Sequence, residues 1–357
     1  MKIALIAPLY EAVPPRLYGG TERVVAYLAN ALVDLGHDVT LFASGDSSTR
    51  ARLVACRNRA IRLDERPLKS DLAAHLAMLD EVRRRAAQFD VLHFHMDLMH
   101  FPFFESIASR TLTTLHGRLD LVDLKDAYAR WPQYALVSIS DRQREALPHA
   151  NWAGTVHHGI PGARDWPAAR AGAGYLAFLG RISPEKRLDR AIRIAQRAGM
   201  PLRIAAKIDQ ADRAYFESEI KHMLDAPGIE FIGEIGDAEK PAFLGNAAAL
   251  LFPIDWPEPF GLVVIEAMAC GTPVIAWDCG AVREIVEEGG TGFIVRSEVD
   301  AVAAVGHVSG LDRARIRRTF ERRFSASTMA RKYVQIYQRL AQHGRGAVLA
   351  ASRTEAA

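Results

Sequence analysis

Short uninterrupted apolar runs alternate along the chain with longer segments in which apolar residues recur at helical spacing. The runs predict strands at residues 2–7, 39–42, 91–94, 111–115, 135–139, 175–180, 202–205, 229–232, 248–252 and 273–276. The segments between them predict helices, one of which carries on one side Val24, Val25, Leu28, Leu32 and Leu35. Strands without apolar–polar alternation are typical of parallel sheets that helices cover on both faces. The predicted fold class is therefore α/β, with two doubly wound domains whose parallel sheets face a central cleft.

A segment rich in Gly, Ala and Pro separates the two sets of strands at residues 159–174. A boundary there divides the 357 residues into an N-terminal domain of residues 1–164 and a C-terminal domain of residues 165–324. The last amphipathic segment predicts a helix over about residues 325–342. Residues 343–357 are mostly small and polar, which predicts a flexible tail.

The composition narrows the class of protein. The chain is 49% hydrophobic and 24% charged, which is typical of a soluble globular protein, and no apolar run approaches the ~20 residues that span a bilayer. Cys56, Cys270 and Cys279 form no C-x-x-C pair, which indicates free thiols and a cytoplasmic protein. No group of His, Cys and Asp has the spacing of a metal site, so we expect no metal and no cofactor.

The charge distribution bears on the kind of partner. A formal net charge of +3 is too small to indicate a nucleic-acid-binding protein. The basic residues gather at 50–69, 83–85 and 313–323, and solvated helix faces explain most clusters of this kind. The alternative is attraction to an anionic membrane surface or to a lipid-diphosphate acceptor, which would make the protein peripheral at the inner membrane face.

Glu258 and Glu266 are two carboxylates eight positions apart in the most distinctive stretch of the chain. Residues 262–270 predict a helix that is apolar nearly all round, so Glu266 within it is buried and needs a polar partner. Glu258 lies on the loop before this helix. In a purely structural interpretation, Glu258 stabilises the helix dipole and Glu266 completes a buried polar network.

The start of the same helix offers backbone donors. The N–H groups of Phe260, Gly261 and Leu262 have no acceptor within the helix and attract an anion or hydroxyl groups. Two carboxylates beside such donors suit a ligand that is both polyhydroxylated and negatively charged. A nucleotide sugar fits that description.

Arg181 and Lys186 flank the turn where the first strand of the second half meets its helix, within Gly-Arg-Ile-Ser-Pro-Glu-Lys. Positive charge at the carboxyl end of a strand suits a diphosphate leaving group, since no metal motif is present to neutralise it. Two ordinary surface cations are the alternative, but the dipole at a helix start disfavours them. That electrostatic penalty favours a ligand.

The first half offers weaker candidates. Gly19 and Gly20 lie between the first strand and the first helix, where residues without Cβ let a phosphate approach the backbone, although turns explain most such pairs. His116 follows the strand at 111–115 and precedes a glycine, although a lone histidine is more often structural. On the acceptor side the candidates are loop residues that follow strands, namely Arg16, Tyr18, His95 and Asp97. His93 and His100, beside several phenylalanines, line a pocket or belong to the core.

These motifs resemble those of the retaining glycosyltransferases of family 4, which have the GT-B fold. Residues 258–275 are similar to the E-x7-E signature of that family nearly without a gap, and residues 180–186 to its Gly-Arg…Glu-Lys segment. The resemblance extends from Ile3 to about Leu340. It implies two Rossmann-like domains, the first on the acceptor side and the second for the donor. It also implies that the last helix crosses back to complete the first domain.

The resemblance implies a metal-independent, anomer-retaining transfer of a sugar from a nucleoside-diphosphate sugar to an acceptor hydroxyl. In that picture the departing diphosphate deprotonates the acceptor on the same face of the sugar, and no protein nucleophile is needed. The acceptor would be a saccharide, a lipid-linked sugar or a small molecule. The implied roles are diphosphate binding by Gly19, Gly20, Arg181 and Lys186, ribose binding by Glu266, binding of the base near Ile232, and sugar binding by Glu258, His116 and the backbone of Phe260, Gly261 and Leu262.

One position departs from the family pattern, and it stands just before the boundary between the domains. Many relatives have Asn-Gly there, whereas this chain has His158-Gly159, which leaves the contact of the Asn side chain without an equivalent. The alternatives for function are a GT-B relative that is epimerase-like or phosphorylase-like, or a non-catalytic nucleotide-sugar sensor. A dinucleotide-dependent oxidoreductase is disfavoured, because no Gly-x-Gly-x-x-Gly follows either first strand.

Overall fold

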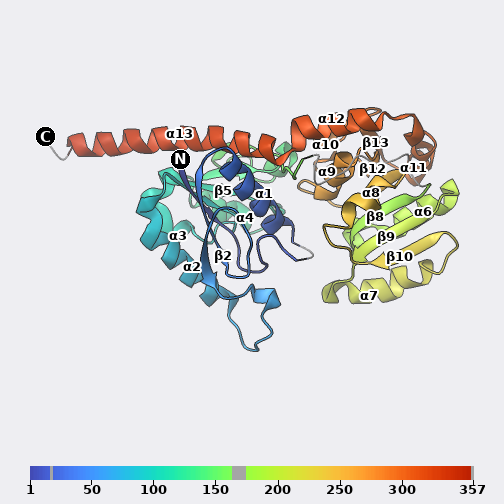
Figure 1. The fold of residues 1–357 in the computed structure, drawn as a ribbon, viewed down its shortest axis with the longest axis horizontal. Coiled ribbons are helices and arrows are strands. Elements are labelled where there is room, and N and C mark those ends of the chain that lie inside the picture. The colour runs from blue at the N-terminus through green and yellow to red at the C-terminus, as the bar shows by residue number, and fades with distance from the viewer. Residues whose placement is uncertain (17–18, 163–173, 355–357) are drawn as a thin grey trace. The chain divides into compact units, whose positions relative to one another are not determined.

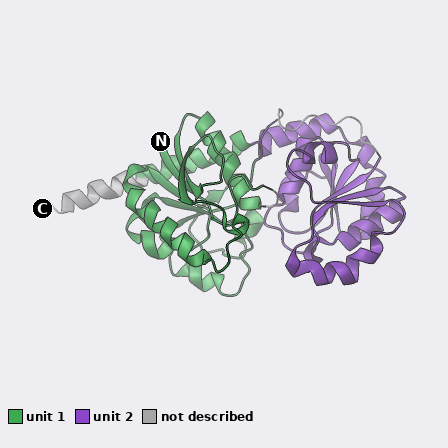
Figure 2. Cartoon of the chain, turned by 60° about the horizontal axis from the view of Figure 1, so that its bottom comes forward, with its two compact units in different colours: residues 1–159, 326–357 green, residues 160–325 purple. Residues whose placement is uncertain are grey.

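The computed structural model describes residues 1–16, 19–162 and 174–354, and beyond residue 342 it describes the backbone alone. The chain forms two compact units, Met1–Gly159 with Ala326–Ala357, and Ile160–Ser325 (Figure 2). Each unit is an α/β domain with a parallel sheet, as predicted from the sequence.

The sheet of the first unit, whose strands are drawn as arrows in Figure 1, has seven parallel strands in the order β3-β2-β1-β4-β5-β6-β7. The strands are β1 (Lys2–Ile6), β2 (Asp38–Ser44), β3 (Arg52–Arg57), β4 (Val91–Phe94), β5 (Thr111–Thr114), β6 (Ala135–Ser138) and β7 (Trp152–Thr155). The two edge strands, β3 and β7, are absent from the sequence prediction. Both are only partly buried and carry polar or small residues, so no continuous apolar run marks them.

The sheet of the second unit has six parallel strands in the order β10-β9-β8-β11-β12-β13. The strands are β8 (Leu176–Arg181), β9 (Leu202–Lys207), β10 (Ile229–Gly233), β11 (Ala249–Phe252), β12 (Val274–Trp277) and β13 (Gly292–Val295). Strands β8 and β11 are neighbours, although their paired residues Leu176 and Ala249 are 73 positions apart and α6, β9 and β10 lie between them in sequence. Their carboxyl ends therefore meet at one edge of the sheet.

Helices follow most strands in both units. In the first unit they are α1 (Gly20–Asp34), α2 (Asp71–Arg85), α3 (Phe101–Phe104), α4 (Leu124–Ala129), α5 (Asp141–Arg144) and α13 (Ala326–Thr354). In the second they are α6 (Leu188–Ala198), α7 (Arg213–Tyr215), α8 (Lys240–Gly245), α9 (Leu262–Ala269), α10 (Val282–Ile285), α11 (Glu298–Val305) and α12 (Arg313–Phe324). Among the described residues, no helix has the length and apolar character needed to cross a membrane.

Helix α13 is longer than the sequence predicts. It continues through the segment that was expected to be a flexible tail, as far as Thr354. The helix end predicted near residue 342 is therefore too early, while the flexibility of the segment stays a prediction. The segment contains several alanines and a leucine, and these residues have high helix propensity.

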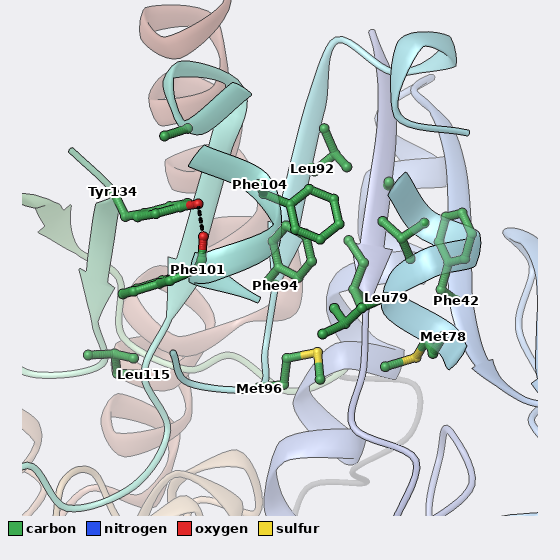
Figure 3. Close-up of a cluster of buried hydrophobic side chains, with 14 of the residues drawn as sticks. Phe42, Met78, Leu79, Leu92, Phe94, Met96, Phe101, Phe104, Leu115 and Tyr134 are labelled. Carbon is green, nitrogen blue, oxygen red and sulfur yellow. Dashed lines mark hydrogen bonds between the residues drawn. The ribbon is translucent and has the colours of Figure 1, made fainter. Parts of the chain in front are cut away.

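The core of the first unit is built around aromatic side chains on and beside β4 (Figure 3). The ring of Tyr134 stacks on that of Phe101 with centroids 4.1 Å apart, and its hydroxyl donates to the Phe101 carbonyl at 2.5 Å. Phe94 meets Phe104 edge to face at 5.0 Å. Close packing of this kind fixes the ends of β4 and β5, from which His95 and His116 extend.

A buried polar network joins α13 to the same sheet. His93 shares hydrogen bonds with the Tyr337 hydroxyl and with Thr114 Oγ1, each at 2.7 Å, and Thr114 meets the Tyr333 hydroxyl at 2.9 Å. His93 and His100 are both fully buried, so of the two interpretations offered by the sequence the structure favours the core.

Candidate functional site

Lys186 and Glu258 form an ion pair in the second unit, 72 residues apart in sequence. Lys186 follows β8 and Glu258 follows β11, so the pairing of these two strands brings both residues to the carboxyl edge of the sheet. Trp256 Nε1 also donates to the paired carboxylate oxygen at 2.8 Å, and Lys186 Nζ lies 5.2 Å from the centroid of the Trp256 ring. The structure therefore brings together two residues that the sequence places in one site, and adds Trp256, which sequence reasoning missed.

Arg181, at the end of β8, is surrounded by carboxylates. Its guanidinium lies 2.5 Å from Glu185, 3.3 Å from Asp212 and 3.7 Å from Asp209. The sequence predicts that this side chain binds a diphosphate, but the three acidic neighbours were not anticipated. An anion that binds Arg181 has to do so within a locally negative environment.

Glu266 lies on α9 with its side chain buried, as predicted. Its polar partner is Lys240, whose Nζ lies 3.0 Å from Glu266 Oε1 and 3.0 Å from Asp237 Oδ1. Sequence reasoning required a partner for Glu266 but did not identify Lys240, which stands at the start of α8. The pair with Lys240 fits the structural interpretation, in which Glu266 completes a buried polar network.

Two glycines let the chain approach itself closely around Glu258. Gly261 precedes α9 with a φ of 94°, and a Cβ there would lie 3.1 Å from the Phe252 ring. A Cβ on Gly280 would lie 2.4 Å from the Glu258 carbonyl oxygen, and the Ala281 N–H donates to that oxygen at 3.1 Å. The backbone of Glu258 is therefore held from the loop after β12, a support that no local motif near Glu258 reveals.

Of the remaining donor-site candidates, Phe260 and Leu262 follow Glu258 on the segment after β11, whereas Ile232 lies on a distant strand. Phe260 is buried and Leu262 begins α9. Ile232, proposed for the base, is partly buried on the edge strand β10, separated from β11 by β9 and β8.

His116 belongs to a cluster of three histidines in the first unit. It follows β5, and its Nε2 lies 2.9 Å from Nδ1 of His95, which follows the neighbouring strand β4. The ring of His158 stacks on that of His116, with centroids 5.2 Å apart and planes 19° from parallel. The position at which the family resemblance implies Asn is thus filled by a buried ring that packs on His116.

Burial controls the charge of these rings. Desolvation lowers the pKa of His116 to about 3. It also lowers the pKa of His95 and His158 well below the usual value, and the neighbouring histidines add to the shift. All three imidazoles are therefore neutral near pH 7, where they donate and accept hydrogen bonds without adding positive charge.

The other first-unit candidates lie on loops or helix ends. Gly19 precedes α1, and a Cβ there would lie 2.8 Å from Pro15 Cβ, while Gly20 is the first residue of that helix. Arg16 and Asp97 are exposed, and Asp97 has a φ of 49°. Tyr18 lies outside the described residues.

Among the described residues, no group of three or more His, Cys, Asp or Glu side chains is arranged to hold a metal ion. The charged groups at the site are the side chains named above, in which cations and carboxylates are paired.

Comparison with known proteins identifies the family. Residues 165–311 match the family described as "Glycosyl transferases group 1", and residues 18–181 match "Glycosyltransferase Family 4". The chain belongs to the group 1, family 4 glycosyltransferases. The expectation drawn from the E-x7-E stretch is thereby confirmed at the level of the family.

Two relatives illustrate the range of this glycosyltransferase family. The chain is 26% identical to glycogen synthase of Mycobacterium tuberculosis (strain ATCC 25618 / H37Rv), with 94% of each protein covered. It is 27% identical to phosphatidyl-myo-inositol mannosyltransferase of Mycobacterium leprae (strain TN), with 96% of this chain and 98% of the relative covered.

Solved structures share the fold along nearly the whole chain. AviGT4, a glycosyltransferase involved in avilamycin A biosynthesis, superposes with a TM-score of 0.70 at 25% identity, covering 96% of this chain and 98% of its own. HepE of Anabaena in complex with UDP and glucose superposes with a TM-score of 0.68 at 17% identity, covering 94% and 98%. The GT-B fold predicted from the sequence is confirmed.

Proposed function

We propose that this glycosyltransferase moves a sugar from a nucleoside-diphosphate sugar to an acceptor hydroxyl, with retention of configuration and without a metal ion. The observation that carries the proposal is the Lys186–Glu258 pair at the carboxyl edge of the second-unit sheet, beside the start of α9. In open α/β sheets, ligands bind at that edge. A cation next to a carboxylate matches a donor that joins a diphosphate to a hydroxyl-rich sugar.

The proposed roles follow from charge and position. Lys186 and Arg181 stabilise the negative charge that develops on the leaving diphosphate, with the backbone at Gly19 and Gly20 as a further phosphate contact. Glu258 accepts hydrogen bonds from sugar hydroxyls. Diphosphate binding competes with Glu258 for Lys186, so the ion pair loosens when the donor arrives and leaves the carboxylate for the sugar.

The remaining groups are proposed to bind the ribose and the transferred sugar of the donor. Glu266 is proposed to bind the ribose, with Lys240 holding its carboxylate in place. His116, neutral because burial lowers its pKa to about 3, contacts the transferred sugar without placing a positive charge beside the developing oxocarbenium. The leaving diphosphate takes the acceptor proton on the face from which it departs, which preserves the anomeric configuration.

The names of similar proteins support the donor class. HepE has been solved in complex with UDP-glucose. The M. leprae relative is named a mannosyltransferase and the M. tuberculosis relative a glycogen synthase. A nucleotide-linked hexose is therefore the first donor class to test in this chain.

The test has two steps. Thermal unfolding is first measured with UDP-, GDP-, ADP- and TDP-sugars, because a ligand that binds the folded state raises the unfolding temperature. The best donor is then incubated with candidate acceptors, and the anomeric configuration of the product is read by NMR. A product of inverted configuration refutes the retaining mechanism. Donor binding without transfer or hydrolysis would instead favour the alternative of a nucleotide-sugar sensor.

The acceptor side carries a separate proposal, peripheral contact with an anionic membrane. Leu68, Leu72 and Leu76 recur at four-residue intervals before and along α2, with exposed fractions of 103%, 61% and 39%. The exposed residues Arg59 and Lys69 lie in the same region and donate to backbone carbonyls, and in the described part of the chain no carboxylate pairs with either of them. Exposed leucines beside basic residues match a surface of anionic lipid.

Co-sedimentation with vesicles tests this contact. The protein should bind vesicles that contain phosphatidylglycerol more strongly than vesicles of phosphatidylcholine alone, and Leu68→Ser with Leu72→Ser should weaken that binding. Val299→Ser removes an exposed apolar residue of the second unit, 63% exposed, and serves as the matched control. Equal binding by the parent and the double variant would refute a membrane contact at these leucines.

A further inference from the structure

Arg187 adopts a backbone conformation that is unfavourable for its side chain. Its φ and ψ are 54° and 50°, in the left-handed region, where it precedes the first residue of α6. Among the described residues, the only other non-glycine residues with positive φ are Leu68 and Asp97. A residue with a Cβ keeps such a conformation only where its surroundings enforce it, and such residues cluster at functional sites.

The side chain of Arg187 supplies that enforcement. Its Nε and Nη2 donate to the two carboxylate oxygens of Asp189 at 3.0 and 2.9 Å, and its Nη1 donates to Asp255 Oδ2 at 2.7 Å. Burial alone would raise the pKa of Asp189, but hydrogen bonds from Arg187 and Arg193 lower it to about 2. The guanidinium is thus held in one orientation by two carboxylates, of which Asp189 has a lowered pKa.

Asp255 connects this arrangement to the candidate donor site. It lies on the segment between β11 and α9, three residues before Glu258. Its N–H donates to the Glu185 carbonyl at 2.9 Å, and Arg190 Nη1 donates to the Pro253 carbonyl at 3.1 Å. These two hydrogen bonds and the ion pairs of Asp255 with Arg187 and, at 3.5 Å, with Arg190 join residues 253–255 to residues 185–190.

Two consecutive residues, Lys186 and Arg187, thus contact two different residues of the segment 253–258. Lys186 pairs with Glu258, and Arg187 pairs with Asp255. The left-handed conformation at Arg187 makes this possible, because it turns the chain between Lys186 and the first turn of α6. Asp255 is more than half exposed, with a side-chain exposure of 54%, so the pairing is not a by-product of core packing.

We propose that Arg187 is a positioning residue for the donor site. It fixes the segment 253–258 before the donor binds, so that Trp256 and Glu258 are already in place around Lys186. A segment that is ordered in advance loses less conformational freedom on binding, which strengthens binding of the diphosphate. This inference rests on the proposed function, which assigns Lys186 and Glu258 to the donor.

Arg187→Gly separates positioning from general stability. Glycine adopts a φ of 54° without strain, so the substitution removes the side-chain contacts but keeps the backbone path. We expect the unfolding temperature to change little, while the dissociation constant for the nucleoside diphosphate that binds the parent best, among UDP, GDP, ADP and TDP, rises about tenfold. Asp255→Ala should have the same effect, and the double variant should be no worse than either single variant.

A ligand-free measurement keeps the two proposals distinguishable. In protein labelled with 5-fluorotryptophan, the Trp256 resonance, assigned with Trp256→Phe, should shift or broaden in Arg187→Gly. Arg193→Ala is the control, because Arg193 pairs with Asp189 and Glu298, both of which lie outside residues 253–258. If the parent binds none of the four diphosphates, the proposed function fails, whereas an unchanged Trp256 resonance in Arg187→Gly overturns the positioning role. Loss of diphosphate binding in Arg193→Ala as well would also overturn it.

Discussion

Nδ1 of His95 lies 2.9 Å from Nε2 of His116, so one hydrogen bond joins the buried ring of His95 to the partly buried ring of His116. Because both rings are neutral, one of them donates and the other accepts, and the tautomer of His95 determines that of His116. The ring of His158 stacks on the ring of His116, with the two centroids 5.2 Å apart. The chemistry of His116 is therefore set by two residues that follow other strands.

The first prediction concerns acid stability. The unfolded chain binds protons on its histidines as the pH falls through about 6.5, whereas burial lowers the pKa of His116 to about 3 and that of His158 well below its usual value in the folded protein. Between these values the unfolded state binds more protons, so the free energy of unfolding decreases as the pH falls. Each such ring contributes up to about 1.4 kcal/mol per pH unit.

His158→Asn, which introduces the residue that the family resemblance implies, should make this dependence less steep. Urea unfolding at pH 7.5, 6.5 and 5.5 measures the effect. At the highest pH the histidine rings are neutral in both states, so parent and variant differ there only in packing. An identical loss of stability in both proteins between pH 6.5 and 5.5 would show that His158 is not kept neutral by burial.

Sequence reasoning found His95 and His116 as separate loop residues, and it could not pair them. Each follows an apolar run and is therefore placed at a strand end by local pattern alone. Their contact depends on β4 lying next to β5, which is a property of strand order. The packing of His158 on His116 could not be predicted for the same reason, since the sequence shows only that His stands where the family resemblance implies Asn.

The second unit shows the same division between local and distant information. Glu258 and Lys186 could be placed because each lies in a motif that combines a strand end with a helix start. Lys240, the partner of Glu266, lies 26 residues before it and in no motif, so only the folded chain reveals the pair. The edge strand β13 was missed because its four residues begin with glycine and form too short an apolar run.

The second prediction concerns the cations of the diphosphate site. Lys186→Ala should weaken binding of a nucleoside diphosphate by roughly 1.5–3 kcal/mol, because a charge-assisted hydrogen bond is lost. Calorimetry with the bare diphosphate measures this change. Unchanged affinity would remove Lys186 from the site. Arg181→Ala should also weaken binding, and it leaves Glu185, Asp209 and Asp212 without their shared cation.

The third prediction follows from that acidic surround. Asp212→Asn removes one negative charge 3.3 Å from Arg181 while keeping a side chain of the same shape. A diphosphate anion should then bind a few-fold more tightly, and raising the salt concentration should reduce the difference, since added ions screen the charge. Weaker binding in this variant would mean that Asp212 orients Arg181 more than it repels the ligand.

The fourth prediction concerns metal ions. If Lys186 and Arg181 neutralise the leaving diphosphate, transfer in excess EDTA should continue at nearly the rate measured without EDTA. The assay compares initial rates with EDTA, with magnesium and with manganese on the same preparation. Activity that disappears in EDTA and returns with either cation would contradict the proposed stabilisation of the leaving group.

The fifth prediction separates the two glutamates. Glu258→Gln should leave binding of the bare nucleoside diphosphate intact or stronger, because Lys186 then loses its competing carboxylate. The same variant should impair transfer, since the charge proposed to hold the sugar hydroxyls is gone. Glu266→Gln should instead weaken binding of both the bare diphosphate and the intact donor. It should also cost about 1–3 kcal/mol of stability, because it reduces the buried pair with Lys240 to a neutral hydrogen bond.

Lys240 limits that cost, because Asp237 lies 3.0 Å from the same ammonium and remains as a partner. Calorimetry with both ligands, combined with urea unfolding, distinguishes the possible outcomes. A loss of stability in Glu266→Gln without any change in ligand affinity would assign this glutamate to the structural network alone. Equal losses of affinity for both ligands in both variants would show that the pair acts only by holding α9 in place. The assignment of sugar to Glu258 and ribose to Glu266 requires the two variants to differ in their response to the bare diphosphate.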